Sequence, residues 1–144
     1  MWSRKKLTEL NPIEFYQISK LRIDTFVVEQ QRIYHELDEK DLEAEHVYHT
    51  NKQGEIDAYA RVFEEGEHLV FGRVVTAQSA RGQGLGGQLI REILQLCAEK
   101  WPGKEIEIEA QVQVAALYEK YGFKSVGQPF IFESTPHITM IYKQ

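Results

Sequence analysis

The first half of the chain contains one helical pattern and four strand patterns. Between residues 12 and 29 apolar residues recur at helical spacing, and Asn11 followed by Pro12 is typical of a helix start. The segments that favour strands span residues 2–8, 46–51, 56–64 and 68–77. Short turns separate the last three, so they are predicted to form an antiparallel meander, whereas residues 2–8 form an edge strand. Residues 30–45 are acidic and irregular and are predicted to be a loop or short helix.

The second half of the chain alternates helical and strand patterns. One face of residues 85–97 is apolar at helical spacing, and Trp101-Pro102-Gly103 ends that helix. The remaining predicted elements are a strand at 105–110, a short helix at 113–121, and strands at 123–132 and 137–142.

This order of elements predicts an α/β fold built on a mixed (α+β) sheet. A meander followed by a β-α-β-α segment gives helices on both faces. The strands at 68–77 and 105–110 are expected to be parallel and joined by a right-handed helical crossover. The 144 residues suit a single domain, 1–144.

The charge balance excludes some classes of function. Lys and Arg number 17 and Asp and Glu 22, a net charge of −5, so the basic stripe of a nucleic-acid binder is missing. No apolar stretch is long enough to cross a membrane, and the N-terminus has no signal-peptide core. A cytoplasmic protein that binds neither nucleic acid nor membrane is expected.

Thiol and metal chemistry have little support in the sequence. The single cysteine, Cys97, lies on the apolar face of the helix at 85–97, so a core position is expected and no internal disulfide can form. The five histidines include no pair at zinc-motif spacing, so no metal site is predicted.

The strongest chemical signal is a glycine-rich loop between a strand and a helix, at residues 78–87. Glycines at a helix start allow phosphate oxygens to approach free backbone N–H groups. The Walker pattern fails because Gln88 follows Gly87. The dinucleotide fingerprint G-x-G-x-x-G matches as text. In dinucleotide-binding proteins, however, this motif opens a doubly wound parallel domain, whereas here it follows an antiparallel meander.

Two motifs resemble the GNAT superfamily of acyl-CoA N-acyltransferases. Arg81-x-x-Gly84-x-Gly86 follows a strand that ends in Val74-Val75-Thr76, and the segment Ala115–Phe123 ends in Tyr-x-x-x-Gly-Phe. Further segments resemble the ElaA group within that superfamily; they are 26–30, 34–42, 59–62, 72–75 and 136–140.

The resemblance implies a reaction and a set of binding residues. The reaction is direct transfer of an acetyl group from acetyl-CoA, the donor substrate, to a primary amine of a small molecule or peptide. Paired subunits are common in the superfamily, so a homodimer is compatible with the resemblance. The implied acetyl-CoA-binding residues are Val74, Val75, Thr76, Arg81, Gly82, Gln83, Gly84, Leu85, Gly86, Gly87 and Gln111, the last replacing an Asn of many relatives.

The resemblance also names candidates for proton transfer. Tyr118 would be the general acid that serves the leaving thiolate. The candidate bases or acceptor-site residues are Glu29, Glu36, Asp38 and His137. Glu107 and Glu109 share one face of the strand at 105–110, so one of them could also reach the cleft as a base.

Structural interpretations stand beside these roles. The acidic run that holds Glu36 and Asp38 could be a solvated surface loop, and its charge would favour a cationic acceptor such as a polyamine or lysine. His137 could be structural. Three aromatic residues, Tyr16, Phe26 and Tyr34, are expected in the core rather than around a substrate.

Two other functions remain open at this stage. One is a non-catalytic acyl-CoA-binding module with a regulatory role, which would keep the glycine loop without turnover. The other is a nucleotide-binding protein. Retention of Tyr118 favours the enzyme over the module.

Overall fold

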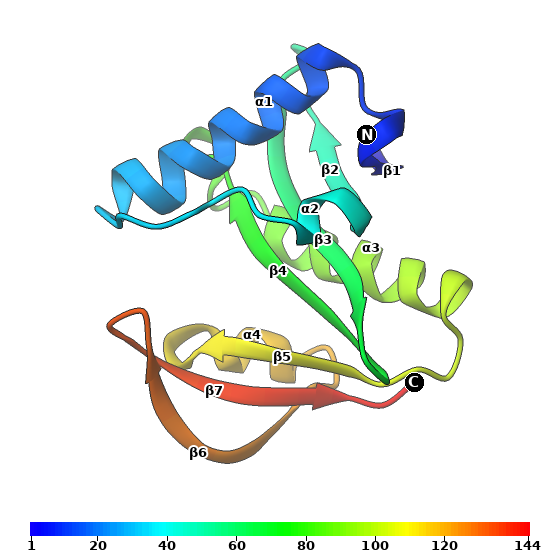
Figure 1. Cartoon of the computed structure of the whole chain (residues 1–144), viewed down its shortest axis with the longest axis vertical. Helices are drawn as coiled ribbons and strands as arrows, with labels where there is room; N and C mark the ends of the chain where they lie inside the picture. Colours follow the sequence, from blue (N-terminus) through cyan, green and yellow to red (C-terminus); the bar gives the residue numbers. More distant parts are fainter.

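All 144 residues are described by the computed structural model, in which one seven-stranded sheet runs in the order β1-β2-β3-β4-β5-β7-β6 (Figure 1). The strands are β1 (Trp2–Lys6), β2 (Glu45–Thr50), β3 (Ile56–Glu65), β4 (His68–Thr76), β5 (Ile106–Gln111), β6 (Lys124–Phe132) and β7 (Thr135–Tyr142). Only β4 and β5 are parallel; every other pair is antiparallel. The predicted meander, mixed sheet and parallel pair are confirmed.

Helices lie on both faces of the sheet. They are α1 (Pro12–Ile23), α2 (Lys40–Glu43), α3 (Leu85–Lys100) and α4 (Ala115–Glu119), and a π-helical turn (Asp24–Glu29) extends α1. The predicted start of α1 is confirmed, because the Asn11 side chain accepts from Glu14 N–H at 2.7 Å and Glu14 accepts from Asn11 N–H at 2.9 Å. The helix predicted at 113–121 is shorter, since Val112–Val114 form a 3₁₀ turn.

Each face of the sheet has its own apolar core. Leu89, Ile93 and Cys97 of α3 are fully buried against one face, so the core position expected for Cys97 is confirmed. On the other face α1 packs Ile18 against a smaller cluster that includes Tyr59. Tyr16 is 61% exposed, so the core position expected for it is wrong.

The sheet opens between its two parallel strands. Leu69 and Ile106 are the only residues of β4 and β5 in register, and beyond them the strands diverge (Figure 1). The edge of Val74–Thr76 that faces β5 is therefore unpaired. Figure 1 also shows α1 over the β2–β4 half of the sheet, which leaves β5 and β7 without a helix on that face.

An irregularity in β4 lies at this opening. Its pairing with β3 shifts between Arg61↔Gly72 and Tyr59↔Val75. Within the shift Arg73 has a φ of +53°, a left-handed conformation that costs a residue with a side chain about 1 kcal/mol. The bulge redirects the strand where the gap begins.

Candidate active site

A cavity of about 380 Å³ occupies the gap between β4 and β5. It brings together seven residues that the sequence assigns to the site, namely Val74, Val75, Thr76, Gly86, Gln111, Tyr118 and His137. Phe26, expected in the core, packs against the smaller core cluster and also borders this cavity. The seven assigned residues come from β4, β5, β7, α3 and α4, and they meet at the point where the sheet separates.

The glycine loop leaves a row of backbone donors free. Gly82 and Gly84 have φ values of +84° and +78°, which favour glycine. The first helical bond of α3 is Gln88 N–H to Gly84 O at 3.2 Å, so the amides of Leu85, Gly86 and Gly87 have no protein acceptor. Open space lies in front of Gly86, which borders the cavity.

These features fit an acyl-CoA molecule. The free amides at the start of α3 suit the diphosphate, and the macrodipole of a 16-residue helix favours its charge. The unpaired edge of Val74–Thr76 offers backbone groups to an extended chain such as pantetheine. Gln111 borders the same gap from β5.

Two residues assigned to acyl-CoA binding have partners within the protein. Arg81 forms a bidentate ion pair with Glu29, in which Nη1 and Nη2 donate to the two carboxylate oxygens at 3.0 and 3.2 Å. Both side chains are exposed, and the Arg81 hydrogen bonds lower the pKa of Glu29. Gly87 lies against the Tyr121 hydroxyl, so its lack of a side chain also has a packing cause.

Tyr118 presents an unpartnered hydroxyl to the cavity. The side chain is 7% exposed, its ring packs on Phe71 and Phe123 at centroid distances of 5.9 and 5.8 Å, and its hydroxyl makes no hydrogen bond within the protein. Burial raises the pKa of Tyr118 to about 12. The hydroxyl therefore keeps its proton at neutral pH and can donate it in a hydrogen bond.

His137 borders the same cavity, and one of its two ring nitrogens is hydrogen-bonded within the protein. Its Nδ1 lies 2.8 Å from the carbonyl oxygen of Thr135, which can only accept, so Nδ1 carries a hydrogen. In the neutral ring Nε2 then holds a lone pair. Phe130 and Phe132 fix the ring at centroid distances of 6.2 and 5.5 Å.

The two glutamates of β5 differ in position. Glu109 borders the cavity and is exposed, while Glu107 lies 3.8 Å from His68 on the strand's other end. Of this pair, only Glu109 faces the space where an acceptor could enter.

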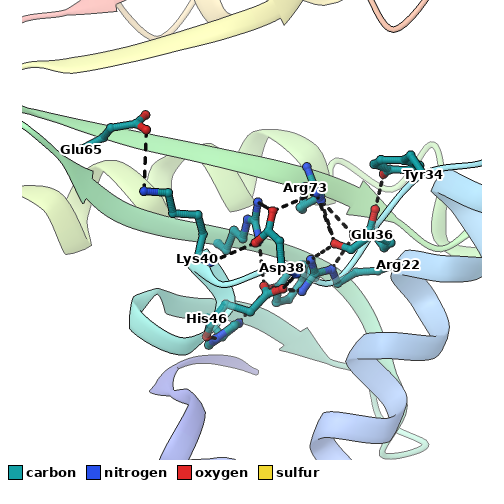
Figure 2. Close-up of polar contacts among 11 residues, drawn as sticks. Arg22, Tyr34, Glu36, Asp38, Lys40, His46, Glu65 and Arg73 are labelled. Carbon is teal, nitrogen blue, oxygen red and sulfur yellow. Dashed lines mark hydrogen bonds and ion pairs between the residues drawn. The ribbon is translucent and has the colours of Figure 1, made fainter.

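Two carboxylates of the acidic run are buried in the protein and are not solvated. Glu36 and Asp41 are only 4% and 6% exposed, and each accepts a 2.7 Å hydrogen bond from Arg22. Figure 2 shows the contact between Arg22 and Glu36. Asp38 is bound by Arg61 at 2.5 and 3.0 Å, and this hydrogen bonding lowers the pKa of Asp38. These carboxylates stabilise the fold as ion pairs, so the surface-loop interpretation is wrong for Glu36 and Asp41.

The sequence analysis missed the arginines that pair with this run. Arg22, Arg61 and Arg73 lie on α1, β3 and β4, far apart in the sequence. The signal that could have indicated two of them is that Arg61 and Arg73 each interrupt a segment that is otherwise apolar and typical of a strand. Burying an acidic run requires matching cations nearby.

A larger groove of about 830 Å³ runs between α1 and the segment Ala77–Ser79. Of the residues assigned to the site it contains only Glu29. Neither Tyr118 nor His137 borders it, so the smaller cavity is the candidate active site.

Comparison with known proteins identifies the family. The profile of the acetyltransferase (GNAT) domain matches residues 15–144. The chain belongs to the GNAT family. This GNAT protein is 32% identical to the protein ElaA of Escherichia coli (strain K12), with 96% of the chain and 94% of ElaA covered.

Solved structures agree with this assignment. An acyl-CoA N-acyltransferase from Pseudomonas aeruginosa superposes with a TM-score of 0.93 at 35% identity, covering 99% of this chain and 98% of that one. The crystal structure of Escherichia coli ElaA gives 0.92 at 31% identity, with 99% and 98% covered. The resemblance to the ElaA group is confirmed, and the protein is an N-acetyltransferase by family and fold.

Two further observations concern other classes of site. No three His, Cys, Asp or Glu side chains come together in a way that could hold a metal ion. None of the helices is both long enough and apolar enough to cross a bilayer.

Proposed function

We propose that this GNAT protein transfers an acetyl group from acetyl-CoA directly to a primary amine of a small molecule or peptide. The observation that carries the proposal is the shared cavity of Tyr118 and His137, each with an unpartnered polar atom, beside the unpaired edge of β4. A cytoplasmic location, a single domain and a homodimer stay predictions.

The chemistry assigns a role to each group. The amine nitrogen attacks the thioester carbon, a C–N bond forms, and the C–S bond breaks. His137 Nε2 takes the proton that the amine loses, directly or through water. A backbone N–H of Val74–Thr76 donates to the thioester oxygen as negative charge develops there. The Tyr118 hydroxyl hydrogen-bonds the departing thiolate.

The two tyrosines that pack on Phe123 provide a matched test. We expect Tyr118→Phe to lower kcat roughly 10- to 1,000-fold with little change in KM for acetyl-CoA, because it removes only the hydroxyl. Tyr142 also packs on Phe123, at 5.2 Å, but lies outside the cavity, so Tyr142→Phe should keep the wild-type rate. CoA release is measured with a panel of primary amines against a blank without acceptor.

The same assay separates the enzyme from a non-catalytic acyl-CoA-binding module. Binding of acetyl-CoA by calorimetry, without CoA release for any amine in the panel, would favour the module. Wild-type turnover by Tyr118→Phe would show that another group serves the thiolate. We expect His137→Gln to lower kcat while the affinity for CoA is kept.

A further inference from the structure

Arg73 is the only arginine that borders the cavity, and part of its guanidinium is unused. Its Nε donates to the Glu36 carboxylate at 3.0 Å, and its Nη2 makes longer contacts of 3.3 Å to Glu36 O and 3.4 Å to Asp38. Nη1 makes no hydrogen bond within the protein. Figure 2 shows this nitrogen pointing away from Glu36 and Asp38. A cationic donor is therefore available at the wall of the cavity.

The Arg73 side chain is held in place by Glu36 and by the Tyr34 ring. Glu36, which binds Arg73, is buried and also bonded to Arg22 and to the Tyr34 hydroxyl. The Tyr34 ring lies 5.4 Å from the guanidinium carbon of Arg73. A planar donor fixed by a buried carboxylate and an aromatic ring is oriented before any ligand arrives.

The backbone of Arg73 is a second, independent observation. Its φ of +53° lies in the left-handed region, which glycine would occupy without strain. Strained residues that persist at a cavity wall are typical of functional sites. The strain sits at the bulge of β4, where it sets the direction of this side chain.

The charge around the cavity does not favour a purely cationic acceptor. The three carboxylates of the network, on Glu36, Asp38 and Asp41, are matched by the guanidinium groups of three arginines. The charge of these three carboxylates, which belong to the acidic run on which the expectation of a polyamine or lysine rested, is thus neutralised within the protein. Arg73 then offers the free N–H donors of its Nη1 at one wall, and Glu109 and His137 offer a carboxylate and an imidazole from β5 and β7.

We propose that Arg73 binds a carboxylate of the acceptor, so that the acceptor is a small molecule carrying both a primary amine and a carboxylate. The inference rests on the proposed function and narrows its substrate class to amino acids and closely related compounds. A guanidinium–carboxylate contact is charge-assisted and directional, which would place the amine toward His137. The cavity of about 380 Å³ must also admit the end of acetyl-CoA, so little room remains for a large acceptor.

The test compares acceptors that differ only in the carboxylate. A panel of amino acids is assayed beside their amides and the amines that lack the carboxyl group. We expect wild-type kcat/KM to be at least tenfold higher for the best acid than for its amide. Arg73→Gln should remove that preference by raising KM for the acid, while KM for acetyl-CoA is kept. Arg4→Gln is the matched control, because Arg4 pairs only with Glu92 and Glu99 on α3.

Two further measurements separate acceptor binding from effects on folding and on turnover. Arg73→Lys keeps a cation beside Glu36 and should retain part of the acid preference, so a loss seen only with Gln is not a loss of fold. Saturation-transfer NMR on the CoA complex, with the same acids and amides, measures acceptor binding without turnover.

The outcomes distinguish the two proposals. Acid-selective binding without CoA release for any amine would refute the transferase reaction and leave the carboxylate site standing. Turnover of amides and simple amines as efficiently as acids would keep the reaction and overturn the role of Arg73. An Arg73→Gln variant that raises KM for acetyl-CoA alone would also overturn it, since Arg73 would then serve the donor.

Discussion

The Tyr121 hydroxyl occupies the place where a side chain on Gly87 would begin. A Cβ built on Gly87 would lie less than 3.0 Å from this oxygen, closer than real Cβ atoms approach. Arg91 donates to the same oxygen at 3.2 Å, so the hydroxyl is held from the next turn of α3. Gly87 therefore permits close packing of the segment after α4 on α3, whatever it contributes to phosphate binding.

This contact predicts that Gly87→Ala lowers the free energy of unfolding in the wild-type protein but not in the Tyr121→Phe variant. Gly87→Ala should lower the free energy of unfolding by about 1–3 kcal/mol, because the new methyl group displaces the hydroxyl. In Tyr121→Phe the nearest remaining ring atom is 3.5 Å away, an ordinary contact. There Gly87→Ala should be neutral or stabilise by up to about 1 kcal/mol, since Ala favours helices over Gly. Urea unfolding of the four proteins measures this, and equal effects in both backgrounds would contradict it.

Gly86 gives a cleaner test of the phosphate assignment. Its φ is outside the left-handed region and no atom lies within 4 Å of its Cβ position, so Gly86→Val can fold. The branched side chain would stand before the free amides, and CoA affinity should fall at least tenfold, about 1.4 kcal/mol. Ala98→Val, at an exposed position of α3, controls for a β-branched residue in that helix. Unchanged affinity by calorimetry would remove the diphosphate from this loop.

Sequence patterns were sufficient for the fold because each element has a local signature. The glycine loop, the Asn11 cap and the Glu–Ile alternation of β5 all depend on neighbours in the chain. The ionic network depends on Arg22 meeting Glu36 and Asp41 through tertiary packing, which no local pattern encodes. The same holds for Arg73, whose unusual φ appears only once β4 pairs with β3.

The pair between Glu29 and Arg81 predicts competition with CoA. Because both side chains are exposed, water and salt screen the pair, and it contributes little to the stability of the protein. Glu29→Gln should free Arg81 for phosphate and raise CoA affinity by a few-fold, with a larger gain at low salt. Calorimetry at two salt concentrations measures the effect. A fall in CoA affinity would mean that Glu29 assists binding instead.

Removing one carboxylate of the buried network should destabilise the protein strongly. Asp41 accepts from Arg22 at 2.7 Å and lies 3.0 Å from Arg61, and Asp41→Asn leaves both cations with one anion fewer. We expect a loss of about 3–5 kcal/mol in the free energy of unfolding. Asp24→Asn, which breaks only an exposed pair with Lys20, should leave the free energy of unfolding almost unchanged. Similar costs for the two variants would show that the network is not stabilising.

His46 predicts a loss of stability in mild acid. It is buried, with Nδ1 2.6 Å from the Tyr59 hydroxyl and Nε2 2.9 Å from the carbonyl oxygen of Asp41, and burial lowers its pKa. At pH 8 the ring is neutral in both the folded and unfolded states. Below about pH 6.5, the ordinary histidine value, the unfolded chain takes up a proton that the folded protein resists. The free energy of unfolding should then fall as pH falls, by up to about 1.4 kcal/mol per pH unit.

Urea midpoints between pH 8 and pH 5.5 measure this dependence, above the range in which the ion-paired aspartates take up protons. His46→Gln should flatten the slope because no titrating ring remains in the buried position. His35→Gln, at an exposed site, should keep the wild-type slope. A wild-type protein equally stable across this range would contradict the assignment, because a neutral buried ring must make stability depend on pH there.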